Sequence, residues 1–345
     1  MRTINRWFSR GPSGTAKDQA KADPQADATD RVLNAGTWAT QKDLIALKKH
    51  AGTFALKQAG SARARLAGNH LSRFRGRGMD YQESRAYQAG DDVRSMDWRV
   101  TARTGDPHVK LYQEEHERPI VLFLDLNPGM FFGSRHMLKS VVAARAAAVI
   151  AWAAADRGDR VGAMLFNGGH CDLQPRGGKH GVLQLIRQLV AHTDPRDGML
   201  AQPVPGDLNA ALIRLRRVSR PGSLVVLLGD FYGIDADTGS HLQRLRQHCD
   251  IVGVQIIDPL ELTPPRAGRY PIAIGHAQGV LDTRSGAARH AYQDYFSQHH
   301  LAVAAIMCSH AIPLLRLATD DDIVAVLRRY FAADIAPPHA SRSAS

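Results

Sequence analysis

Two runs of apolar residues, each followed closely by an aspartate, constrain the fold of this chain most. Residues 120–124 read IVLFL and precede Asp125, while residues 224–228 read LVVLL and precede a glycine and then Asp230. Runs of this length and composition are typical of strands buried on both faces of a parallel sheet. Because the carboxyl ends of parallel strands meet at one edge, the pattern predicts that both aspartates emerge there.

Predicted strands and helices alternate through residues 119–332. This alternation is typical of a doubly wound, Rossmann-like α/β domain, whose mostly parallel sheet is covered by helices on both faces. The helix at the end is expected to begin at Thr319 as its N-cap. The other expected elements are helices at 135–157, 179–192, 206–218, 239–248, 288–309 and 320–332, strands at 160–166, 171–174, 251–257 and 313–317, and a hairpin at 270–283.

The remainder of the chain divides into three segments. Residues 1–36 are expected to form a disordered arm, because most of them are small or polar and few are large and apolar. Residues 37–118 are expected to form a β-rich, irregular segment that begins with an amphipathic helix at 41–50. Residues 333–345 are expected to be a flexible tail.

The overall charge and the cysteines limit the possible partners and surroundings. The 345 residues carry a net charge of +11, which favours association with nucleic acid, an anionic lipid surface or an acidic protein. Cys171, Cys249 and Cys308 are widely spaced, so the sequence predicts neither a disulfide framework nor a cysteine zinc site. The most apolar run, residues 141–155, is shorter than the roughly 20 residues that cross a bilayer. We therefore expect a cytoplasmic protein.

The segment between Ala62 and Arg118 is dense in charges of both signs. It contains 11 Lys or Arg and 9 Asp or Glu, so the charges nearly cancel. Mixed charges favour internal pairs between arginines and carboxylates over a uniform field for nucleic acid, which we do not expect as a partner. We interpret the segment as an ion-paired recognition element rather than a catalytic site, with the Trp98 ring buried against the α/β domain.

The same segment resembles the signature of the domain of unknown function 58 family. The matching stretches are GRGMD at 76–80, ESRAY at 83–87, GDDVRSMDW at 90–98 and TAR at 101–103. With the helix before it and the α/β domain after it, the resemblance covers roughly residues 38–332. The signature residues are Gly78, Glu83, Arg85, Tyr87, Gly90, Asp91, Asp92, Arg94, Asp97, Trp98 and Arg103.

The resemblance implies a von Willebrand factor A-like fold joined to a family-specific N-terminal segment, in a short cytosolic form without membrane spans. It also implies a non-enzymatic adaptor or co-chaperone of a MoxR-type AAA+ ATPase, with other von Willebrand factor A proteins as further partners. Such an adaptor would serve in protein assembly or remodelling. The segment from Gly76 to Arg103 and the loops at the strand ends would be its recognition surface.

The resemblance further implies a place for Mg²⁺, which this fold normally binds through a D-x-S-x-S loop, a threonine and an aspartate. Asp125 and Asp230 match, whereas Asn127 and Gly129 replace the two serines, and Asp207 lies where the threonine is expected. Mg²⁺ prefers a complete, near-octahedral shell of oxygen ligands. The expectation is therefore weak Mg²⁺ binding, or else a remnant site whose loops form a partner surface.

Two other functions fit parts of the sequence. A metal-dependent hydrolase would use Asp125 and Asp230, although neither G-x-S-x-G nor H-E-x-x-H occurs in the chain. A nucleic-acid-binding protein would account for the positive net charge, and binding would then weaken steeply with salt.

Overall fold

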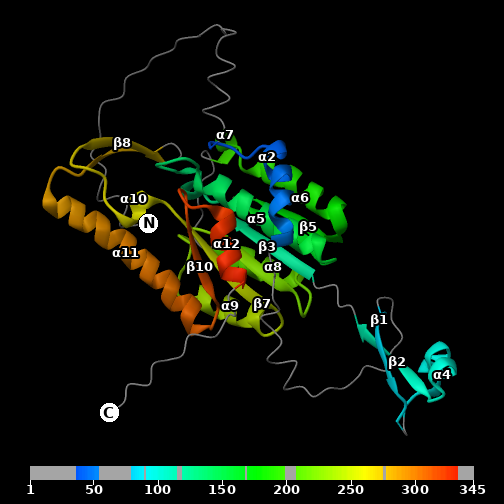
Figure 1. Ribbon diagram of the computed structural model, residues 1–345. Helices are drawn as coiled ribbons and strands as arrows, with labels where there is room; N and C mark the ends of the chain where they lie inside the picture. Colours follow the sequence, from blue (N-terminus) through cyan, green and yellow to red (C-terminus); the bar gives the residue numbers. More distant parts are fainter. Residues whose placement is uncertain are drawn as a thin grey trace, which may run out of the picture. The chain divides into compact units, whose positions relative to one another are not determined.

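A computed structural model of the chain describes two compact units, one within residues 60–117 and the other formed by the rest (Figure 1). The expected N-terminal arm, except Gly36, and the expected tail at 333–345 lie outside the described residues. The described ranges are 36–53, 79–88, 91–114, 119–167, 169–198, 207–274 and 277–332.

The larger unit is built on a six-stranded sheet with the order β10-β7-β6-β3-β4-β5. All neighbours are parallel except β4 and β5, which are antiparallel. Counted along the chain, the order is 3-2-1-4-5-6, so the winding reverses between β3 and β6. The predicted doubly wound α/β fold is confirmed. The strands are β3 (Pro119–Asp125), β4 (Arg160–Phe166), β5 (His170–Gly177), β6 (Leu224–Gly229), β7 (Asp250–Ile257) and β10 (Leu314–Ala318).

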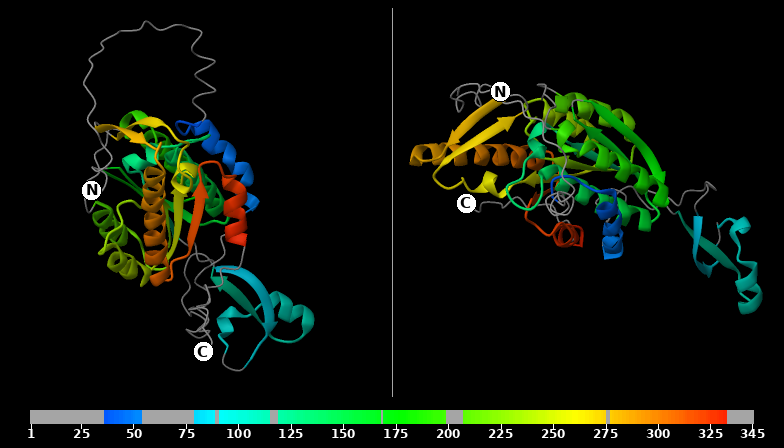
Figure 2. Two further views of the ribbon diagram at one scale, coloured as in Figure 1. Left: turned by 90° about the vertical axis from the view of Figure 1, so that its left-hand side faces the viewer. Right: turned by 90° about the horizontal axis from the view of Figure 1, so that it is seen from above.

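Helices cover both faces of this sheet, and each face has its own apolar core (Figure 2). This arrangement explains why β3 and β6 are apolar at successive positions: both faces of each strand are buried. One face carries α2 (Gln41–Ala46), α5 (Lys139–Asp156), α6 (Gly178–His192) and α12 (Ile323–Ala332), and the other carries α8 (Asp207–Val218), α9 (Thr238–Arg246) and α11 (Gly286–Ser309).

Helix α11 extends beyond the sheet at its N-terminal end (Figures 1 and 2). Its buried residues, among those described, are His300, Val303 and Met307, all in the C-terminal half. The antiparallel hairpin of β8 (Arg269–Ile274) and β9 (Ala277–Asp282) lies at the same end, as predicted for 270–283. Short elements complete the unit: η2 (Leu47–Thr53), η4 (Pro128–Phe131), α7 (Pro195–Gly198) and α10 (Pro259–Leu262).

The helix predicted at 41–50 forms as α2 and η2, but it packs on the α/β unit rather than within the segment 37–118. Leu44 is fully buried in the core beneath α5. The indole Nε1 of Trp152 on α5 donates a hydrogen bond to the Leu44 carbonyl at 3.0 Å. An amphipathic helix must bury its apolar face against another apolar surface, and the Ala-rich helix α5 provides that surface for α2.

Two predicted helix starts are wrong by several residues. Helix α5 begins at Lys139 rather than residue 135, because the Leu138 N–H donates to the Gly36 carbonyl and the Lys139 N–H to the Phe132 carbonyl, both outside a helical pattern. Helix α12 begins at Ile323, and the Asp322 carboxylate accepts a capping hydrogen bond from the Ala325 N–H. Thr319 is therefore not the N-cap.

The smaller unit is an antiparallel pair, β1 (Met79–Ala86) and β2 (His108–Glu114), with the short helices η3 (Val93–Ser95) and α4 (Trp98–Thr104) between them. Asp97 and Val109 are its buried residues among those whose side chains are described. In neither unit does any described helix have the length and apolar character needed to span a membrane.

The docking of α2 on α5 generates a stability prediction. Leu44→Ala should lower the free energy of unfolding by about 2–5 kcal/mol, since it empties a fully buried site. Ile45→Ala on the same helix, at 37% exposure, is the matched control and should cost well under half of that. Equilibrium unfolding in urea measures both variants, and equal losses would contradict the docking.

Candidate functional site

The strand-end site lies at the carboxyl edge of β3 and β6, where the winding of the sheet reverses. Asp125 ends β3, and Asp230 follows β6; their exposed fractions are only 2% and 1%. Gly229 lets the end of β6 lie close to Asp125, since an added Cβ at this glycine would be 2.9 Å from the Cβ of Asp125. The structure thus brings together the two aspartates that the sequence predicted.

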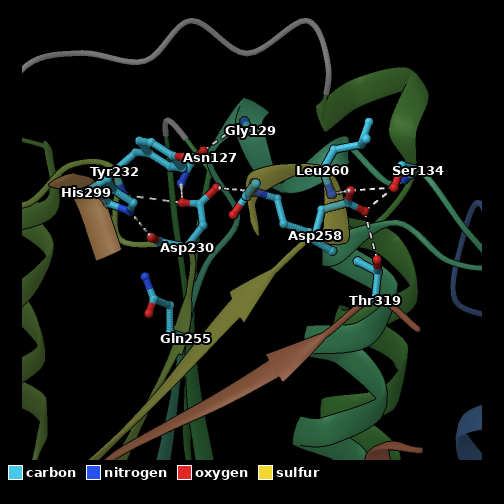
Figure 3. Close-up of polar contacts among 12 residues, drawn as sticks. Asn127, Gly129, Ser134, Asp230, Tyr232, Gln255, Asp258, Leu260, His299 and Thr319 are labelled. Carbon is cyan, nitrogen blue, oxygen red and sulfur yellow. Dashed lines mark hydrogen bonds and ion pairs between the residues drawn. The ribbon is translucent and has the colours of Figure 1, made fainter. Parts of the chain in front are cut away.

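Asn127 joins its own loop to Asp230 (Figure 3). Its Oδ1 accepts a hydrogen bond from the Gly129 N–H at 2.8 Å and caps η4, while its Nδ2 donates to Asp230 Oδ1 at 2.7 Å. A Cβ at Gly129 would lie 3.0 Å from both Asn127 Oδ1 and Asp230 Oδ2. A serine side chain would therefore be crowded at the position where the family pattern has one.

A buried lysine, which no motif in the sequence predicted, binds the other carboxylate oxygen of Asp230. The Nζ of Lys139 donates to Asp230 Oδ2 at 2.9 Å and to Glu261 Oε1 at 2.7 Å. The Lys139 side chain is only 2% exposed, and Nζ also lies 5.5 Å from the centre of the Tyr232 ring. Lys139 is the first residue of α5 and Glu261 lies in α10, so one ammonium joins three segments of the chain.

The charges in this cluster are set by burial and by their neighbours. Burial alone would lower the pKa of Lys139, but Asp230 and Glu261 outweigh it and hold that pKa above its ordinary value. Burial and the nearby Asp230 raise the pKa of Asp125 to about 7. Burial also raises the pKa of Glu261, although Lys139 opposes the shift. Lys139 is therefore charged, while Asp125 is poised to hold a proton near neutral pH.

Aromatic and histidine side chains border the ion cluster. His299 stacks on Tyr232 with ring centres 3.8 Å apart, and its Nε2 donates to the Asp230 carbonyl at 2.8 Å. Gln255 Nε2 donates to His300 Nδ1 at 3.2 Å, while His300 Nε2 lies 4.0 Å from Glu261 Oε2. Within the described part of the chain, Glu261 Oε2 and His300 Nε2 have no hydrogen-bond partner.

Asp258 fastens the loops beside this cluster (Figure 3). It is fully buried and accepts hydrogen bonds from the Ser134 N–H and hydroxyl, the Leu260 N–H and the Thr319 hydroxyl, at 2.5 to 3.0 Å. Burial opposes ionisation, but these donors lower the pKa of Asp258. Thr319, predicted as a helix cap, instead ties the end of β10 to this carboxylate.

The residues described at the strand-end site do not fit a bound Mg²⁺. Both carboxylate oxygens of Asp230 accept hydrogen bonds from protein donors, and the carbonyl oxygen of Asn127 is directed into its own loop. The Lys139 ammonium lies beside Asp230, where it would repel a divalent cation. Among the described residues no group of three or more His, Cys, Asp or Glu could hold a metal. Asp207 begins α8, but its side chain is outside the described part.

The charged residues of the smaller unit mostly cap short helices. The Asp97 carboxylate accepts from the Arg99 and Val100 N–H groups at the start of α4 and from the Ser84 hydroxyl. Asp92 caps η3. One ion pair forms among the residues described here, Arg85 with Asp91 at 2.7 Å. Among the described residues of this unit, carboxylates thus act mainly as backbone caps, because the short helices expose N–H groups that need acceptors. The predicted network of arginine–carboxylate pairs is represented there by Arg85 and Asp91.

The expected burial of Trp98 against the α/β domain stays a prediction, but within the smaller unit its ring is not buried. It is 66% exposed at the start of α4, and Val93 on η3 is 56% exposed. Arg94 and Arg103 are exposed in the same unit. The Tyr87 N–H pairs with the Pro107 carbonyl. Of the other signature residues, Gly78 and Gly90 lie outside the described residues, and Glu83 lies in β1 with its side chain undescribed.

The raised pKa of Asp125 generates a prediction about stability and pH. Between its ordinary value of 3.8 and about 7, the folded protein holds a proton that the unfolded chain releases. Stability from this group is therefore present at low pH and is lost as the pH rises to about 7. Asp125→Asn should match the wild type near pH 4 and be more stable at pH 8, by about 1–4 kcal/mol.

Urea unfolding of both proteins at intervals from pH 4 to pH 9 measures this difference. A variant that is less stable than the wild type at pH 8 would show that the ionised carboxylate stabilises the fold.

Comparison with known proteins agrees with the signature. The family model described as "Protein of unknown function DUF58" matches residues 83–302. Uncharacterized protein Rv1480 of Mycobacterium tuberculosis and uncharacterized protein Mb1516 of Mycobacterium bovis are each 31% identical over 277 residues, which cover 77% of this chain and 83% of each relative.

Solved structures resemble the chain more distantly. Conserved hypothetical protein BatB from Bacteroides thetaiotaomicron is 11% identical, with a TM-score of 0.37 over 62% of this chain and 97% of that one. A von Willebrand factor type A protein from Catenulispora acidiphila is 10% identical, with a TM-score of 0.34 over 65% and 43%. The family match over residues 83–302 and the mycobacterial relatives lead to one conclusion: this chain belongs to the DUF58 family.

Proposed function

We propose that this protein is a non-enzymatic adaptor that binds a MoxR-type AAA+ ATPase in the cytoplasm and takes part in protein assembly or remodelling. The signature between Gly76 and Arg103 supports the choice of partner, because it resembles a family associated with such ATPases. The observation that carries the adaptor role is the exposure of Trp98 on the smaller unit.

The smaller unit exposes apolar surface that a partner would cover. Its two described buried side chains are Asp97 and Val109, yet the largest apolar side chain, Trp98, is 66% exposed. Covering apolar surface gains about 25 cal/mol per Å². Tryptophan and arginine are also the side chains that most often dominate binding energy at interfaces. Arg99 and Arg103 share helix α4 with Trp98, so the surface suits an apolar pocket bordered by carboxylates.

The strand-end site supports an adaptor more than a hydrolase. Asp125 and Asp230 are almost fully buried, and both oxygens of Asp230 are held by Asn127 and Lys139. A catalytic carboxylate needs access to its substrate or to a metal-bound water. The hydrogen bonds and ion pairs among these buried residues fix the surrounding loops, which favours a rigid contact surface over a reaction centre.

The exposed tryptophan generates the test of this proposal. Trp98→Ala should weaken binding to the MoxR-type ATPase by about 30-fold, which corresponds to about 2 kcal/mol. Leu301→Ala is the matched control: Leu301 is 67% exposed on α11 of the larger unit. Affinity is measured with purified ATPase, with and without ATP, and circular dichroism checks that both variants fold.

If the Trp98→Ala and Leu301→Ala variants bind equally well, the Trp98 side chain does not contribute to the interface. Absence of ATPase binding by the wild type, in either nucleotide state, would contradict the partnership. If the protein instead bound DNA or RNA tightly at low salt, the nucleic-acid alternative would gain support.

A further inference from the structure

We propose that Lys139 is the resident cation of the strand-end site, and that the geometry of the site is independent of divalent metal ions. The position beside Asp230 and Glu261 is filled by the protein's own ammonium group.

The ammonium joins the loops as a bridging ion would. Asp230 follows β6, Glu261 lies in α10 after β7, and Lys139 begins α5 after the loop that follows β3. Its contacts at 2.9 and 2.7 Å are short, charge-assisted hydrogen bonds. Three segments that are distant in sequence are therefore held at the edge of the sheet by one positive charge.

Because these three residues are buried, we expect the ion pairs of Lys139 with Asp230 and Glu261 to persist in the folded protein. The side chains of Lys139, Asp230 and Glu261 are 2%, 1% and 4% exposed, respectively. A buried lysine is stable only when its charge is compensated, and a buried carboxylate likewise. Each therefore depends on the other, and exchange of the ammonium for a hydrated metal ion would require the loops to open.

The two first-loop residues beside Asp230, Asn127 and Gly129, direct no side-chain oxygen toward it. Asn127 presents its amide hydrogens, not its oxygen, to Asp230 Oδ1. Gly129 offers no side chain, and a serine there would press on Asp230 Oδ2 at a Cβ distance of 3.0 Å. The replacements in the first loop and the buried lysine are thus consistent with one another: hydrogen-bond donors have taken the place of metal ligands.

The arrangement also affects how a partner would be recognised at this edge. A protein-bound metal with an open position can accept an oxygen ligand from a partner. The Lys139 ammonium cannot, because it is buried between its two carboxylates and the Tyr232 ring. Contacts of a partner with this edge would therefore involve the side chains around the cluster, and chelators would not weaken them.

The first test uses the wild-type protein with Mg²⁺ and Mn²⁺ themselves as probes. Thermal unfolding in 5 mM EDTA and in 5 mM of either ion should give the same Tm to within about 1 °C. Calorimetric titration should detect no stoichiometric binding below millimolar concentrations. Saturable submillimolar binding that is lost in Asp230→Asn would overturn the proposal.

The second test removes the resident cation. Lys139→Ala should lower the Tm by on the order of 10 °C, because it leaves buried carboxylates without a counter-charge. Ethylammonium at tens of millimolar should restore part of the loss in this variant and have no effect on the wild type. Neutral ethanol at the same concentration controls for effects of the solvent.

A further variant keeps the test decisive if Lys139→Ala fails to fold. Lys139→Met fills the same space without charge, and the triple variant with Asp230→Asn and Glu261→Gln also removes the facing charges. The triple variant should be more stable than Lys139→Met alone. If it is equally or less stable, charge compensation is not the role of Lys139, and the proposal fails.

Discussion

The paired charges of Lys139, Asp230 and Glu261 are the interaction on which the strand-end site depends. The Lys139 Nζ lies 2.9 Å from Asp230 Oδ2 and 2.7 Å from Glu261 Oε1, and these residues are 91 and 122 positions away from Lys139 in the sequence. Buried charges are costly unless they are paired and hydrogen-bonded, so the three side chains fix one another. Asn127 donates to the same Asp230 carboxylate, whereas His299 donates to the Asp230 main-chain carbonyl and stacks on the Tyr232 ring.

The sheet supplies the setting for this cluster. In a doubly wound fold the loops diverge where the winding reverses, and here that point lies between β3 and β6. Such a crevice commonly receives a ligand. In this protein the loops there are joined to one another by the hydrogen bonds of Asp258 and by the ion pair of Lys139 with Asp230. The strand-end site is a cluster of buried, mutually bonded side chains. The smaller unit, in contrast, exposes Trp98 and has few buried side chains among those described.

The two units therefore divide the chemistry of the molecule. In the strand-end site of the larger unit, Asp230 and Glu261 form ion pairs with Lys139, and Asp258 accepts hydrogen bonds from backbone N–H groups of the loops. In the smaller unit, carboxylates such as Asp97 and Asp92 cap short helices, which leaves Arg94 and Arg103 exposed for other contacts. The adaptor that we propose would use the apolar and cationic side chains of the smaller unit to bind its partner.

The sequence by itself determined the fold class, since apolar runs such as 120–124 are typical of strands buried on both faces and alternate with predicted helices. It also determined that Asp125 and Asp230 would share one edge, because parallel strands end together. Only the tertiary structure decided what compensates those aspartates. Lys139 stands at the head of an apolar helix and looks like a surface residue by type; its burial depends on Glu261, 122 residues away. Pairings over such distances leave no periodicity in the sequence, and the same holds for the link between Thr319 and Asp258.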